Sequence, residues 1–153
     1  MKNALKIKEA LYNQCKIFVD NRLLTIQNTI SEIQESLTSE TKSSAGDKHE
    51  TGRAMLQIER EKAGNQLAEI LKIRENLSKV DALKTSNKVS LGSIIYTTNG
   101  NYYIAISAGI LEVESKSFFA ISPNTPIGQL LFSKTIGDTI TFRTNNLTIT
   151  DII

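Results

Sequence analysis

Residues 19–37 read VDNRLLTIQNTISEIQESL, and this stretch decides the fold of the first half of the chain. Its apolar residues recur at steps of three, four, three and four: Leu23, Ile26, Ile30, Ile33 and Leu37. That spacing is the a/d seam of a coiled coil, a single apolar stripe along a helix. Val19 and Cys15 extend the stripe backward. Because no Pro or Gly precedes Gly46, one helix is predicted from about residue 4 to residue 37, roughly 50 Å long at ~1.5 Å per residue.

A second apolar stripe follows a polar interval. It consists of Leu56, Ala63, Leu67, Ile70, Ile73, Leu77 and Val80. Two single-stripe helices of matched length bury their stripes on each other, so residues 1–82 are predicted to form an antiparallel coiled-coil hairpin. The interval between them, residues 38–52, is rich in Ser, Thr and Gly and is predicted to be the tip of the hairpin.

The second half of the chain has a different period. After a linker at residues 83–90, β-rich runs at 93–97 and 102–106 flank Asn99-Gly100, a strong hairpin signal. Further strands are predicted at 110–114, 118–121, 139–143 and 147–152. A short helix at 126–132 would have Thr125 as its N-cap and Pro126 as its first residue. The prediction is an α+β protein, in which a small antiparallel β domain at 91–153 follows the hairpin.

Composition narrows the function classes. The chain has 153 residues, 22% of them charged, and a net charge of +2. Residues 1–83 hold 13 Lys/Arg and 12 Asp/Glu, a balance typical of an exposed hairpin and not of a nucleic-acid binder with its surplus of positive charge. Cys15 is the only cysteine, which excludes an intrachain disulfide. The first residues lack the apolar core of a signal peptide, and no apolar run approaches the ~20 residues that span a bilayer, so a cytoplasmic protein with no membrane partner is expected.

Asp47 and Glu50 are the candidate functional residues of the tip. Two interpretations remain open. An Asp followed by Glu three residues later is the pattern of an N-cap with its capping-box partner, which is a structural role. Alternatively, two carboxylates at the end of a stalk have no packing role there and form the working end of a probe.

Three segments, taken in order, carry a resemblance to a known family. Between the two predicted helices lies Gly46-Asp47-Lys48-His49-Glu50, which resembles the Gly-Asp-x-x-Glu tip of the bacterial Gre transcript-cleavage factors. The short helix opens with Asn124-Thr125-Pro126-Ile127-Gly128-Gln129-Leu130-Leu131, which resembles the Asn-Ser-Pro-Ile-Ala/Gly-x-x-Leu segment of that family. A predicted strand is preceded by Lys134-x-x-Gly137-Asp138, which resembles the family's Lys-x-x-Gly-Asp turn. The resemblance spans nearly the whole chain.

The resemblance implies a function. In that family an FKBP-like second domain binds RNA polymerase at the rim of its secondary channel, and the coiled coil enters the channel. The tip carboxylates then help to hold a second Mg²⁺, and the polymerase hydrolyses the 3′ end of a backtracked transcript. By this resemblance Asp47 and Glu50 would orient a Mg²⁺ shared with RNA polymerase, and Thr125, Pro126 and Ile127 would dock on the polymerase. The protein would be a monomer that contacts nascent RNA indirectly. It would not be an enzyme itself, and it would not bind metal tightly when free.

One departure from the family pattern leaves alternatives open. The family has a Glu-Asn-Ala-Glu-Tyr run at the tip, whereas here Glu50 is followed by Thr51, Gly52, Arg53 and Ala54. An Arg in place of a carboxylate keeps open a regulator that occupies the channel without stimulating cleavage. A coiled-coil interaction or chaperone-like protein is the alternative from another class. A prolyl isomerase is suggested by analogy with the FKBP fold alone.

Overall fold

The computed structural model describes residues 2–42 and 46–153, and the side chains of residues 3–40 and 51–153. Two compact units make up the chain. One comprises Met1–Phe18 and Glu75–Ile153, and the other comprises Val19–Arg74. The first turns of the N-terminal helix thus belong to the same compact unit as the β domain, and the division into residues 1–82 and 91–153 stays a prediction. Within the described residues, no helix is both long and apolar enough to cross a lipid bilayer.

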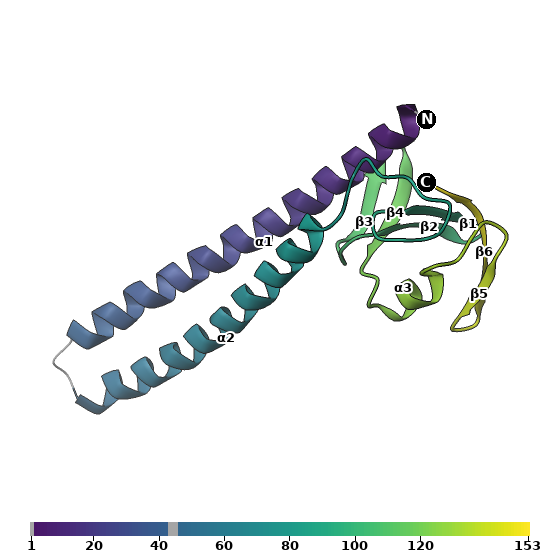
Figure 1. Cartoon of the computed structure of the whole chain (residues 1–153). Helices are drawn as coiled ribbons and strands as arrows, with labels where there is room; N and C mark the ends of the chain where they lie inside the picture. Colours follow the sequence, from purple (N-terminus) through teal and green to yellow (C-terminus); the bar gives the residue numbers. More distant parts are fainter. Residues whose placement is uncertain (1, 43–45) are drawn as a thin grey trace. The chain divides into compact units, whose positions relative to one another are not determined.

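The unit Val19–Arg74 contains the parts of two long helices, α1 (Lys2–Lys42) and α2 (Gly46–Ser78), that run antiparallel in Figure 1. The predicted stripes are the buried positions of both helices. On α1 these are Val19, Leu23, Ile26 and Ile33, and on α2 they are Ala63 and Ile70. Ile30, Leu37, Leu56 and Leu67 on the same stripes are half-buried. The hairpin prediction is confirmed, since seam residues lose water only by packing against the other stripe.

The helices extend further into the tip than predicted. Residues 38–52 were expected to form a turn, but α1 continues to Lys42 and α2 begins at Gly46. Most of that interval is therefore helical, and residues 43–45 lie outside the described part of the chain. The Ser/Thr residues that suggested a turn are tolerated because hydroxyls on an exposed helix can bond back to the preceding turn, as Thr38 Oγ1 does by donating to the Gln34 carbonyl at 3.0 Å.

The other unit is built on a six-stranded sheet with the order β3-β4-β2-β1-β6-β5. Its strands are β1 (Ile94–Thr97), β2 (Gly100–Ile104), β3 (Gly109–Val113), β4 (Lys116–Ile121), β5 (Thr139–Phe142) and β6 (Asn145–Ile152). All six predicted strands and the β1–β2 hairpin at Asn99-Gly100 are present. The α+β class predicted from the sequence is confirmed, while the FKBP-like description stays a prediction.

The expectation of a purely antiparallel sheet is wrong at one pair, because β2 and β4 are parallel. The short connection 105–108 runs along β4, with Ala105 N donating to Ile121 O and Ala108 N to Ala120 O. This connection carries the chain past one strand position, so that β3 becomes the edge strand. The β3–β4 hairpin then folds β4 back between β3 and β2.

Side chains on the two faces of the sheet enter different contacts. On one face, α3 (Pro126–Leu131) contributes the fully buried Leu131 to a core with Ile95, Ile104 and Ile149. Alternation along β2 places Tyr103 on the opposite face. The first turns of α1 approach that face, since Tyr12 and Cys15 lie close enough to influence the Tyr103 hydroxyl, and Gln14 Nε2 donates to the Glu112 carbonyl of β3 at 2.9 Å. Cys15 is fully buried there, as its place in the apolar stripe predicts.

Candidate functional site

The acidic pair occupies the start of α2. Asp47 and Glu50 are the second and fifth residues of this helix, so their backbone is helical and they lie three positions apart on one side of it. Asp47 therefore lies inside the helix and not at the cap position that the capping-box interpretation assigned to it. Negative charge in the first turn of a helix is stabilised by the exposed N–H groups and the helix dipole. The side chains of both residues lie outside the described part of the structure.

The flank of the tip adds a third carboxylate that the sequence analysis did not single out. A Cβ built on Gly52 of α2 would lie 3.5 Å from Glu40 Oε1 of α1. Glu40 therefore lies across from the helical turn that follows Glu50. Arg53 and Thr51 on the same turn are exposed. The described end of the hairpin thus has an acidic side chain from α1 and a basic one from α2.

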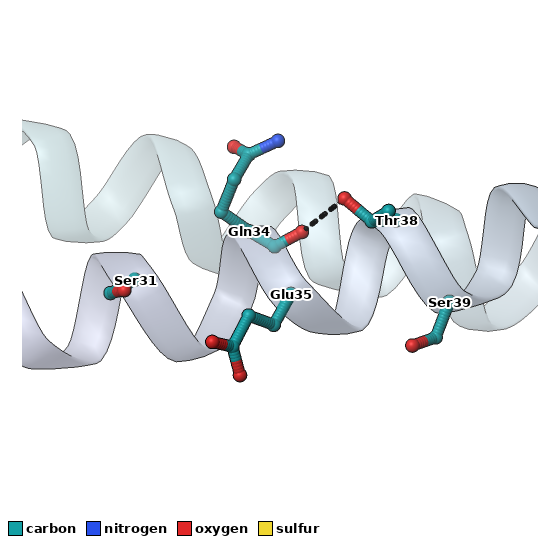
Figure 2. A pocket seen from close by; sticks show the side chains of 5 residues that line it. All are labelled: Ser31, Gln34, Glu35, Thr38 and Ser39. Atoms are coloured by element: carbon teal, nitrogen blue, oxygen red, sulfur yellow. Dashed lines mark hydrogen bonds between the residues drawn. The ribbon is translucent and has the colours of Figure 1, made fainter.

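A polar hollow of about 440 Å³ lies further along α1 (Figure 2). Five residues line it: Ser31, Gln34, Glu35, Thr38 and Ser39. They recur at helical spacing, so they share one side of α1 beside the buried stripe. Hydroxyl, amide and carboxylate groups suit hydrogen bonding to a polar ligand. The described residues contain no group of three or more metal-binding side chains, so nothing in this hollow indicates a metal centre.

Thr125 and Pro126 begin α3 as predicted. The Thr125 hydroxyl accepts a hydrogen bond from Gly128 N at 3.1 Å and donates one to the Ser122 carbonyl at 2.8 Å. Pro126 follows in the first turn, where a missing N–H costs nothing. The capping role of Thr125 is therefore confirmed, and its hydroxyl is occupied within the loop.

The three predicted docking residues present different surfaces. Pro126 is exposed, whereas Ile127 is half-buried and packs against the core of the sheet. The exposed apolar surface of α3 and the residues after it continues instead through Leu130 and Phe132, which are 39% and 41% exposed. The sequence pattern did not single out Leu130 and Phe132 as surface residues of a docking site. The signal that could have identified them is the predicted short helix at 126–132, in which both residues lie.

The third motif of the resemblance is a structural turn. Gly137 has a φ of 93°, a conformation that favours glycine. The Asp138 carboxylate accepts hydrogen bonds from the backbone N–H of Thr135 at 2.8 Å and from its hydroxyl at 3.2 Å. The hydrogen bond from the Thr135 backbone, followed by that from its side chain, lowers the pKa of Asp138. This carboxylate therefore serves the turn that leads into β5.

Tyr103 is a buried polar group that sequence reasoning did not identify. It has no exposed surface, and its hydroxyl has no hydrogen-bond partner among the described residues. Burial raises the pKa of Tyr103, with Cys15 and Tyr12 of α1 adding to the effect. Burial also raises the pKa of the Cys15 thiol to about 12, so this cysteine is a packing residue and not a nucleophile at neutral pH.

Comparison with known proteins finds similarity to solved structures and none in sequence. No protein-family model matches the chain, and no curated protein matches it in sequence. Among solved structures, that of the transcription factor Gfh1 aligns with 92% of this chain and 92% of its own, at 16% identity and a TM-score of 0.35. A superposition of that quality does not assign a function, so the function is argued from the fold and the tip.

Proposed function

We propose that this protein is a Gre-like transcription factor of the bacterial cytoplasm that binds RNA polymerase. Its β-domain unit would dock on the polymerase, and its hairpin would enter the secondary channel and stimulate cleavage of backtracked RNA. The observation that carries the proposal is the position of Asp47 and Glu50, within the first five residues of α2, where a two-helix hairpin reverses direction. A helical hairpin with an acidic pair at its tip suits a probe that acts inside another protein.

The lengths of the helices support this proposal. The 41 residues of α1 and the 33 of α2 correspond to roughly 60 and 50 Å at ~1.5 Å per residue. A hairpin much shorter than this would not carry its tip far into a channel. Continuation of helix up to Lys42 and from Gly46 also stiffens the segment that was expected to be a long turn, so the acidic pair is presented by a helix.

The donor set of the tip fits Mg²⁺ only in part. Carboxylate oxygens are the ligands that Mg²⁺ prefers, but two residues from one helical turn cannot complete an octahedral shell. Asp47 and Glu50 would therefore share the ion with acidic residues of the polymerase. When bound, the ion would supply charge stabilisation and an activated water for phosphodiester hydrolysis. The role of this chain is to bring and orient the two carboxylates, so the protein is not an enzyme on its own.

Transcript cleavage in stalled, backtracked complexes of the cognate RNA polymerase tests the proposal. We expect the wild-type protein to shorten RNA 3′ ends and to bind the polymerase, and Asp47→Ala with Glu50→Ala to abolish shortening while retaining binding. The matched control is Glu59→Ala with Glu61→Ala, which removes the same charge from exposed positions further along α2. Loss of polymerase binding in the tip variant, with helicity preserved, would contradict the separation of docking from tip chemistry. Failure of the wild-type protein to bind polymerase at all would leave the coiled-coil interaction protein as the better hypothesis.

A regulator that occupies the channel without cleavage is the second candidate, and the exposed Arg53 favours it. A guanidinium one helical turn from the acidic pair would compete with a metal ion for the carboxylates. Arg53→Glu supplies the carboxylate that the resembled family has at this position. If the wild-type protein binds without cleaving, Arg53→Glu should produce cleavage, whereas Lys62→Glu, an equal charge change further along the helix, should not.

A further inference from the structure

Lys8 is a buried lysine in the first turns of α1. Its side chain is 1% exposed, and its Nζ donates a hydrogen bond to the backbone carbonyl of Lys84, which lies 76 residues further along the chain. Burial lowers the pKa of Lys8 to about 8, against the attraction of the Asp81 carboxylate, which raises it. A buried amine normally persists only where specific partners offset the cost of desolvation. Here both partners belong to the segment that leaves α2.

The segment that receives Lys8 is a compact turn. Asp81 Oδ1 accepts a hydrogen bond from Leu83 N at 2.9 Å, and the Val80 side chain is buried, with 7% of its surface exposed. A Cβ added to Gly92 would lie 3.2 Å from Val80 Cγ1 and 3.4 Å from the Asp81 carbonyl oxygen. The turn is therefore held by Lys8 and is in close contact with the Gly92 turn before β1.

We propose that Lys8, Asp81 and Lys84 form a clasp that fixes residues 79–90, the strap connecting α2 to β1, against the first turns of α1. In the sequence this strap has the composition of a flexible linker. Residues 88–89 at the end of the strap are also held by the Lys88–Thr135 bridge and by hydrogen bonds of Val89 with Lys134 and Ser133, so the clasp acts on residues 81–84, where Lys8 of α1 supplies the ammonium group. Removing that group should free the strap locally while the sheet and its core stay folded.

Limited trypsin digestion of the full chain measures this release directly. Trypsin cleaves after lysine, and the scissile carbonyl at Lys84 is the oxygen that Lys8 holds. That oxygen must leave Lys8 to enter the oxyanion hole of the protease, so cleavage there reports the open population of the clasp. Lys8→Met keeps the length and apolar packing of the side chain but removes the donor. Because hydrogen bonds to charged groups contribute more than neutral ones, we expect cleavage after Lys84 to be about tenfold faster or more.

Three comparisons make this result specific. Lys6→Met changes an exposed lysine two residues away and should leave cleavage after Lys84 unchanged. Cleavage after Lys116, in the β3–β4 hairpin, should be equal in all variants. Asp81→Asn keeps an oxygen to cap Leu83 but removes the charge that attracts Lys8, so it should accelerate cleavage after Lys84 by a smaller factor than Lys8→Met does.

Two outcomes would overturn the proposal. One is unchanged cleavage after Lys84 in folded Lys8→Met, and the other is an equal rise at Lys84 and Lys116, which would indicate global destabilisation. If Lys8→Met does not fold, Asp81→Asn decides, because unchanged cleavage after Lys84 in that variant also refutes the clasp. Polymerase binding plays no part in the measurement, so the result is independent of the proposed function.

Discussion

Gly128→Ala should destabilise the β-domain unit far more than a typical surface substitution. A Cβ at this position would lie 2.8 Å from Thr125 Oγ1 and 3.1 Å from Pro123 Cα, and it would overlap the Ser122 carbonyl oxygen. The Ser122 oxygen accepts two hydrogen bonds, from Thr125 N at 3.1 Å and from the Thr125 hydroxyl at 2.8 Å. To make room for the methyl group, this oxygen must move away from both donors. Each lost hydrogen bond costs about 1 kcal/mol, and overpacking adds about 1–3 kcal/mol. The expected loss in the free energy of unfolding is therefore about 3 kcal/mol or more.

Urea unfolding followed by tyrosine fluorescence measures this loss. All four tyrosines lie in the unit formed by Met1–Phe18 and Glu75–Ile153, so the signal reports the unit that contains Gly128. Thr125→Ser is the matched control, since it keeps the capping hydroxyl and should change stability by less than about 0.5 kcal/mol. A Gly128→Ala protein within about 0.5 kcal/mol of wild type would refute the claim that the cap leaves no space for a methyl group. In the polymerase-binding assay, Gly128→Ala should also weaken docking, because it displaces Thr125 and the residues that follow.

Three further results are expected. Tyr103→Phe should be neutral or raise the free energy of unfolding by about 1 kcal/mol, because it removes a buried hydroxyl without a partner among the described residues; a clear loss in the same urea assay would show that the hydroxyl is satisfied. The free energy of unfolding of wild type minus that of Lys8→Met should rise by about 3 kcal/mol between about pH 8 and pH 10.5. Over that range the unfolded wild-type chain holds the Lys8 proton and the folded chain does not, so a higher pH favours the folded state of wild type alone. The difference is the readout because Cys15, with its raised pKa, lowers the stability of both proteins above about pH 9, and a pH-independent difference would contradict the lowered pKa of Lys8. Gly64→Ala should stabilise α2 by about 0.5–1 kcal/mol by far-UV circular dichroism, since the added Cβ meets only the Arg60 guanidinium, at 3.1 Å, and a destabilised helix would show that this side chain cannot move.

The sequence by itself determined the features that depend on a short repeat or on the backbone preferences of a few neighbouring residues. The a/d stripe identified both long helices, because burial on a helix recurs at fixed steps of three and four. Asn99-Gly100 identified the β1–β2 hairpin, and Thr125-Pro126 identified the start of α3, because both signals depend on the backbone preferences of the residues themselves. The acidic pair was also visible, since it stands at the junction of two periodic segments.

The ends of the long helices near the tip were not predictable in the same way. Ser, Thr and Gly between residues 38 and 52 favour a turn by intrinsic propensity. In the folded chain the seam continues through Leu37 on α1 and Leu56 on α2, which are both half-buried. Tertiary packing along that seam outweighs the small propensity cost of each polar residue.

Only the tertiary structure decided how distant segments combine. The parallel pairing of β2 with β4 depends on where the 105–108 connection places β3, and neither strand carries a signal for the direction of its neighbour. The burial of Lys8 depends on a carbonyl 76 residues away, and that of Tyr103 on side chains of α1. A sequence pattern encodes which face of an element is apolar, whereas the partner of that face is selected by packing the whole chain, and this is why the clasp and the orphan hydroxyl appear only in the folded protein.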